Sequence, residues 1–76
     1  MQKLFYMVSK EIEKILTFCL EVKNKKPDYI ILSKEKYIEL CYELQAPNIK
    51  EFKGMEIVTT HYAGKDLLQL GYGAHS

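Results

Sequence analysis

The sequence predicts an α+β fold in which two helices pack on a small sheet. Apolar side chains recur with a helical period over residues 8–22. A short β-branched and aromatic run at residues 29–32 follows a Pro-Asp pair and precedes a Ser-Lys-Glu segment, as is typical of a strand that leads into a helix. Strand-favouring residues and glycines fill residues 54–70. The expected order is helix, strand, helix, strand, strand, in a single domain over residues 1–76 with a frayed tail at 71–76.

The first helix is predicted from one apolar stripe and from the residues at its two ends. Ser9 is expected to cap the N-terminus through its hydroxyl, and Pro27 to prevent the helix from continuing. Residues 3–8 are compatible with either a strand or an earlier turn of the same helix. The stripe consists of Val8, Ile12, Ile15, Leu16, Cys19 and Leu20.

The segment KKPDYIILSKEKYIEL, residues 25–40, contains the end of that helix, a strand and the start of a second helix. The apolar run is expected to form a buried strand, and Ser33 to cap the helix that follows. The tetrapeptides VSKE at 8–11 and LSKE at 32–35 therefore indicate the same cap used twice. The apolar stripe of the second helix is expected to contain Tyr37, Leu40, Cys41 and Leu44, widened by Ile38.

The last third of the chain is expected to form strands. Residues 57–60 favour a strand, and Gly54 before them predicts a turn or a bulge. Ala63 and Gly64 predict a second turn, after which residues 66–70 pair back as another strand.

Composition and charge narrow the function classes. The chain is 47% hydrophobic and 28% charged, which are ordinary values for a globular protein. No apolar run approaches the roughly 20 residues that span a bilayer, and the N-terminus lacks the order of a signal peptide, so we expect a cytoplasmic protein. All 11 basic residues are lysine. Without the planar fork of arginine, sequence-specific reading of DNA is disfavoured, although lysine contacts to phosphate remain open.

The cysteines and histidines do not predict a metal or a cofactor. Cys19, Cys41, His61 and His75 contain no pair at the close spacing of a CxxC or HxxxH motif. The two thiols are expected in the core, with a disulfide or a reactive thiol as the alternatives. Residues 60–65, THYAGK, lack a phosphate-loop pattern and are expected at a polar hairpin tip. No catalytic role follows for any residue, so the chain is not expected to be an enzyme.

Two features indicate a surface for protein contact. Six tyrosines and three phenylalanines are many for 76 residues, and tyrosine tolerates an interface well because it has an apolar body and a polar tip. Three glutamates at positions i, i+4 and i+8 of the second helix form either a solvated face or an acidic stripe for a basic partner. The candidate interaction surface consists of Tyr37, Tyr42, Phe52, Tyr62, Glu35, Glu39 and Glu43.

The same segments carry a family resemblance. Residues 25–40 lead from a helix through a Pro-Asp-apolar-apolar strand to a serine cap, and FKGMEIVTT at 52–60 contains a Gly-aliphatic-Val strand. Over residues 9–70 this order resembles the axial domain of tailed-phage major capsid proteins, which gathers around the centre of each pentamer or hexamer. Those proteins also have a peripheral domain, an extended loop and an N-terminal arm, without counterparts here. The resemblance implies at most an excised or free-standing relative, such as a phage-encoded or prophage-encoded accessory protein.

The first functional hypothesis is a non-enzymatic protein that self-associates or binds a larger phage or host protein by burying a patch rich in Tyr, Phe and Leu. The alternative is a small regulator that binds nucleic acid or an enzyme's active cleft. It would use the acidic stripe or a lysine-rich face that consists of Lys10, Lys14, Lys23, Lys25 and Lys26.

Overall fold

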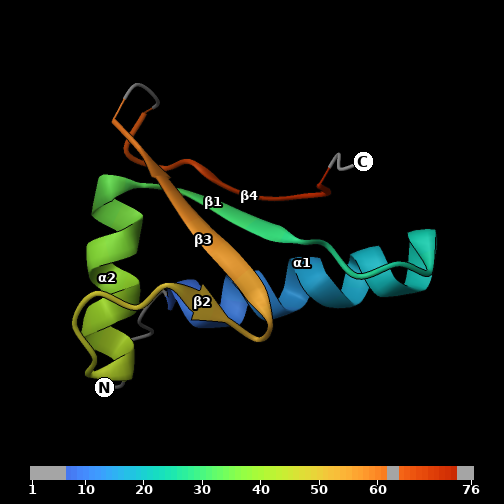
Figure 1. Cartoon of the computed structure of the whole chain (residues 1–76), viewed down its shortest axis with the longest axis horizontal. Coiled ribbons are helices and arrows are strands. Elements are labelled where there is room, and N and C mark those ends of the chain that lie inside the picture. The colour runs from blue at the N-terminus through green and yellow to red at the C-terminus, as the bar shows by residue number, and fades with distance from the viewer. Residues whose placement is uncertain (1–6, 62–63, 74–76) are drawn as a thin grey trace, which may run out of the picture.

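The chain folds into two helices and a four-stranded sheet, which confirms the α+β class (Figure 1). The computed structural model describes residues 7–61 and 64–73, and the elements named here lie within them. The helices are α1 (Val8–Lys23) and α2 (Lys34–Leu44), and the strands are β1 (Tyr29–Ser33), β2 (Glu51–Phe52), β3 (Met55–Thr60) and β4 (Leu68–Gly71).

Strand β1 is central in the sheet, whose order is β2-β3-β1-β4. It pairs parallel with β3 and antiparallel with β4, so that Ile30 lies opposite both Ile57 and Leu70. The predicted last strand therefore exists, but it pairs with β1 on the side away from β3. A strand that is apolar at successive positions is suited to this central place, since both of its edges are paired.

Both helices pack on the same face of the sheet, as the sequence predicts. Ile30 and Leu32 alternate along β1 and are fully buried, whereas Ile31 between them is only half-buried on the other face. In Figure 1, α2 stands against the N-terminal end of α1, and the C-terminal end of α1 extends past the strands. The buried core cluster consists of Val8, Ile12, Ile30, Leu32, Leu40 and Met55.

A tight hairpin joins β2 to β3 at the position of the predicted turn. Lys53 and Gly54 form its two-residue loop, and both have positive φ, at 55° and 81°. Two positive φ angles are the requirement of a type I′ turn, whose twist matches that of the flanking strands. Gly54 adopts this conformation without the steric cost that a side chain would add.

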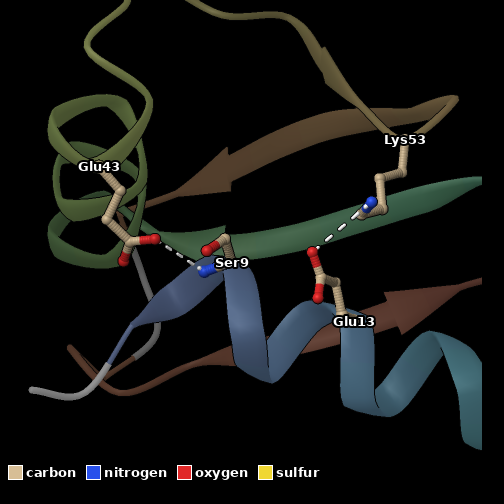
Figure 2. Close-up of polar contacts among 4 residues, drawn as sticks. All are labelled: Ser9, Glu13, Glu43 and Lys53. Atoms are coloured by element: carbon tan, nitrogen blue, oxygen red, sulfur yellow. Dashed lines mark hydrogen bonds and ion pairs between the residues drawn. The ribbon is translucent and has the colours of Figure 1, made fainter. Parts of the chain in front are cut away.

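The start of helix α1 differs from the prediction. Its N-cap residue is Met7, which makes no side-chain capping bond, and Ser9 lies inside the first turn. The predicted Ser9 cap is therefore wrong. The backbone N–H groups of Val8 and Ser9 instead donate to the two carboxylate oxygens of Glu43 on α2. Figure 2 shows the bond from Ser9, which is 3.1 Å long. Residues 3–6, part of the ambiguous segment 3–8, lie outside the described residues.

The Glu43 carboxylate suits this position for two reasons. The first N–H groups of a helix have no partner within the helix, and those of the buried residues Val8 and Ser9 need one. A negative charge is also favoured at the positive end of the helix dipole. One side chain thus satisfies two donors and fixes the end of α1 against α2.

The predicted Ser33 cap is confirmed, and the same side chain does more than cap. The Ser33 hydroxyl oxygen accepts from the Lys36 N–H at 3.1 Å, and the hydroxyl donates to the Lys65 carbonyl at 2.7 Å. The Ser33 N–H also donates to the carbonyl of Leu67 at 3.1 Å. Ser33 therefore starts α2 and holds the segment that enters β4.

A frayed tail was predicted from residue 71 onward, but residues 71–73 are hydrogen-bonded to the rest of the domain. Gly71 belongs to β4, and its carbonyl accepts from the Asp28 N–H at 2.9 Å. The Gly73 N–H donates to the Asp28 carboxylate at 2.7 Å, and the Tyr72 hydroxyl donates to the Lys25 carbonyl at 2.8 Å. Residues 74–76 of the predicted tail lie outside the described residues.

We predict that Glu43→Gln lowers the free energy of unfolding by about 1–3 kcal/mol, because the amide has only one oxygen and no charge to offer the two N–H groups. Urea denaturation followed by far-UV circular dichroism measures this loss. The matched control is Glu39→Gln, which removes the same charge from an exposed position of the same helix. Equal losses in the two variants would contradict the role of Glu43.

A second prediction compares the stability lost on mutating Ser9 of VSKE (8–11) and Ser33 of LSKE (32–35). Ser33→Ala should lower the free energy of unfolding by about 1–2 kcal/mol, because it removes a helix cap and leaves the buried end of β1 without its hydroxyl. Ser9→Ala should cost clearly less, because Ser9 is not the cap of α1. If both variants lost the same stability, the two serines would have equivalent roles.

Candidate interaction surface

The outer side of α2 carries an apolar ridge beside an acidic one. Ile38 and Tyr42 are one helical turn apart and are 55% and 85% exposed. Glu35 and Glu39, also one turn apart, are exposed next to them. We call Glu35, Ile38, Glu39 and Tyr42 the α2 face.

Shallow hollows flank the Ile38–Tyr42 ridge on both sides. One, of about 550 Å³, extends from the ridge toward the C-terminal end of α2 and reaches Cys41 and Pro47. The other, of about 390 Å³, lies between the ridge and the glutamates at 39 and 43. A ridge between two hollows is a shape into which side chains of another helix can interdigitate.

Tyr37 belongs to the inner side of α2 and not to the α2 face. Its hydroxyl donates to the Ile49 carbonyl at 3.0 Å, and its ring packs against the core. Burial raises the pKa of the Tyr37 phenol above its ordinary value of 10.0, and a hydrogen bond with the neighbouring Cys41 thiol adds to this. Tyr37 is thus a packing residue that ties α2 to the segment before β2.

The inner side of α2 differs from the predicted stripe. Leu40 is fully buried and Tyr37 half-buried, as expected for the centre of that stripe. Leu44 is 38% exposed, however, and Ile38 faces outward, whereas Glu43 turns inward to α1. The buried side of α2 is thus turned toward Glu43, whose carboxylate bonds to the N-terminus of α1.

The other predicted surface residues do not join the α2 face. Phe52 on β2 is half-buried against the core, and the Lys53 ammonium lies 5.5 Å from the centroid of its ring. Tyr62 lies outside the described residues. Of the seven predicted residues, the structure therefore brings together Tyr42, Glu35 and Glu39.

A larger groove of about 710 Å³ lies between α2, the segment before β2, and β3. Glu51 and Glu56 lie directly opposite each other across the β2–β3 pair on its wall, and Lys50 provides a basic group beside them. Among the described residues, no three His, Cys, Asp or Glu side chains are placed to hold a metal ion. The groove is a polar surface with charges of both signs, and its lining is Tyr37, Ile49, Lys50, Glu51, Glu56, Ile57 and Thr59.

A second exposed surface, not predicted from the sequence, lies on α1. Phe18 and Val22 are 60% and 61% exposed, and they continue a ridge that begins with the exposed Lys10 and Lys14 at the same four-residue spacing. We call Lys10, Lys14, Phe18 and Val22 the α1 face. The signal was present in the sequence, because neither Phe18 nor Val22 falls on the predicted apolar stripe.

Four of the five lysines of the predicted basic face divide into two groups. Lys23 and Lys25 place their ammonium groups 5.3 and 5.7 Å from the centroid of the Tyr72 ring. Burial raises the pKa of the Tyr72 phenol above 10.0, with the thiol of buried Cys19 as the next contribution. Lys10 and Lys14 lie toward the other end of α1. Lys23 and Lys25 are thus engaged in closing the fold around Tyr72.

Comparison of the chain with protein-family models, with curated proteins and with solved structures gives no match. The resemblance of residues 9–70 to the capsid axial domain therefore stays a prediction. Within the described residues, neither helix has the length and apolar character needed to cross a membrane.

We predict that Tyr37→Phe lowers the free energy of unfolding at pH 7 through loss of the bond to Ile49. Because the folded-state pKa of Tyr37 is raised, its contribution is complete below pH 10 and is lost as the pH rises through the folded-state value. The difference between wild type and variant should therefore shrink on going from about pH 9 to about pH 11. Urea denaturation at each pH measures it.

The control is Tyr42→Phe, which removes the same hydroxyl from an exposed ring and should change stability little at pH 7. A constant difference between wild type and Tyr37→Phe across the pH range would contradict the assignment of Tyr37.

Proposed function

We propose that the protein is a non-enzymatic interaction protein that self-associates in the cytoplasm through the outer sides of its helices. The observation that carries this proposal is the exposure of Tyr42, at 85%, next to Ile38 on the same helical ridge. Single exposed apolar residues are normal on a protein surface, but adjacent ones that form a ridge are typical of a contact site. The α1 face repeats this arrangement with Phe18 and Val22.

Tyrosine suits the centre of such a contact. Its ring supplies a large rigid area at a small cost in side-chain entropy, and tyrosine is enriched among the residues that dominate binding energy. Ile38 extends the apolar area, and Glu35 and Glu39 border it with charge that favours one orientation of the partner.

The capsid resemblance supports a narrower form of the proposal, in which the protein is a phage or prophage accessory protein. Axial domains of that family meet copies of themselves around a symmetry axis, which agrees with self-association. This part of the proposal rests on the pattern of residues 9–70.

Gel filtration with light scattering tests self-association, over protein concentrations from roughly 10 µM to 1 mM because a small interface is expected to be weak. The average mass should rise above the 8.9 kDa of one chain as the concentration increases. Tyr42→Ala should weaken the association about tenfold or more. Val58→Ala, which trims an exposed apolar side chain on β3, is the control and should not weaken it.

A strict monomer over the whole concentration range would remove self-association and leave only a different protein as partner. Association that is unaffected by Tyr42→Ala would place the contact elsewhere on the molecule.

The exposed Lys10 and Lys14 favour a second candidate, a regulator that binds nucleic acid through phosphate contacts. Fluorescence anisotropy with labelled duplex and single-stranded DNA at low salt tests it. Binding should weaken steeply as salt is added and should weaken further in Lys10→Gln and Lys14→Gln. The absence of binding to either DNA at low salt would reject this candidate.

A further inference from the structure

We infer that self-association is head-to-tail, with the α2 face of one copy docked on the α1 face of a second copy. The inference rests on the proposed self-association and adds the identity of the two surfaces. The α2 face consists of Glu35, Ile38, Glu39 and Tyr42, and the α1 face consists of Lys10, Lys14, Phe18 and Val22.

The charges of the two faces are complementary. The α2 face carries two exposed carboxylates, at Glu35 and Glu39, and the α1 face carries two exposed ammonium groups, at Lys10 and Lys14. A symmetric contact of two α2 faces would bring carboxylates together, and one of two α1 faces would bring ammonium groups together. Like charges across an interface are unfavourable, so each face is better matched by the other than by itself.

The two faces also match in the order and spacing of their residues. Along α1 the lysines come first and Phe18 follows, over about 12 Å of helix from Lys10. Along α2 both glutamates precede Tyr42, with Ile38 between them, over about 10 Å from Glu35. Two parallel helices therefore bring each lysine to a glutamate and Phe18 to Tyr42. The hollows beside Tyr42 lie where this alignment places the apolar end of the α1 face.

Other charges near the α1 face are compatible with this alignment. Glu13 lies about 100° around α1 from Lys14, outside the α1 face, and is 3.6 Å from Lys53 of its own chain. Glu21, which is exposed, lies beyond Phe18 and is level with the uncharged Gln45 of the other helix. On α2, Lys34 comes directly before Glu35 and so lies at the N-terminal end of the α2 face.

A head-to-tail contact has a consequence for the assembly. Because the two faces are different places on one chain, each docked copy keeps one free face, and association continues into open chains unless the geometry closes a ring. A single helix-on-helix contact buries less than a standard interface, so we expect the average mass to rise gradually with concentration.

Two variants that each disable one face test the inference. Tyr42→Asp disables the α2 face and keeps the α1 face, and Phe18→Asp does the reverse. Both positions are exposed, so the variants should fold, which circular dichroism checks. Each variant alone should be monomeric where wild type associates. Their equimolar mixture should form a dimer that grows no further, because only one intact face of each kind remains.

Charge reversal provides a second readout with a matched rescue. Glu39→Lys alone and Lys14→Glu alone should each weaken association about tenfold or more. A mixture of the two should recover association in alternating copies, because the α2 face of each variant is complementary in charge to the α1 face of the other. Gln69→Asp adds a charge at an exposed position of β4 and serves as the control, with no expected change.

The outcomes separate the inference from the proposed function. If Phe18→Asp alone still dimerises while Tyr42→Asp does not, the contact is symmetric through α2 and the head-to-tail inference is overturned. If the mixtures recover nothing, or if Gln69→Asp weakens association as much as the other charged variants, the inference also fails. If wild type is a monomer under all conditions, the proposed self-association fails first.

Discussion

The contact of Glu43 with the N-terminus of α1 is the interaction on which the arrangement of the two helices depends (Figure 2). Its carboxylate comes from the inner side of α2, one turn after Leu40, and reaches the N–H groups of Val8 and Ser9 at the buried start of α1. Nearby, the Glu13–Lys53 ion pair is 3.6 Å long and both side chains are more than 40% exposed, so that solvent screening leaves it little energy. A charge with two buried donors constrains the fold in a way that an exposed pair does not.

The orientation of each helix on the core explains which residues form the exposed faces. Once Leu40 and Glu43 point inward, the periodicity of α2 turns Ile38 and Tyr42 to the outside, although Ile38 was expected to widen the buried stripe. On α1, Val8 and Ile12 face the core and leave Phe18 on the outside. The surfaces proposed for self-association thus lie on the sides of the two helices that do not face the core.

The two ends of β1 organise the rest of the chain. At the C-terminal end, Ser33 starts α2 and binds the carbonyls of Lys65 and Leu67. Before the N-terminal end, the Asp28 backbone bonds to Gly71 and Glu56, and its carboxylate accepts from Gly73. The chain therefore leaves β3, passes the Ser33 end and returns as β4 along the free edge of β1. Small polar residues at strand ends hold segments that are far apart in sequence.

Sequence features that act over a few neighbouring residues determined much of the secondary structure of this protein. The helical periods, the apolar run of β1, the glycine of the Lys53–Gly54 turn and the Ser33 cap all act over a few residues, and each was predicted from the sequence. Tyr42, Glu35 and Glu39 were likewise recognised as a surface from composition and spacing, whereas Phe18 and Val22 were overlooked although their spacing indicates an outer ridge. The tertiary structure decided what depends on distant partners. Ser9 and Ser33 have the same local sequence, yet only Ser33 is a cap, because Glu43, 34 residues from Ser9, takes over the start of α1. The pairing of β4 with β1 and the inward orientation of Glu43 also depend on residues that are distant in sequence. A buried N–H group or a strand edge without a partner is bonded by whichever group the fold brings next to it.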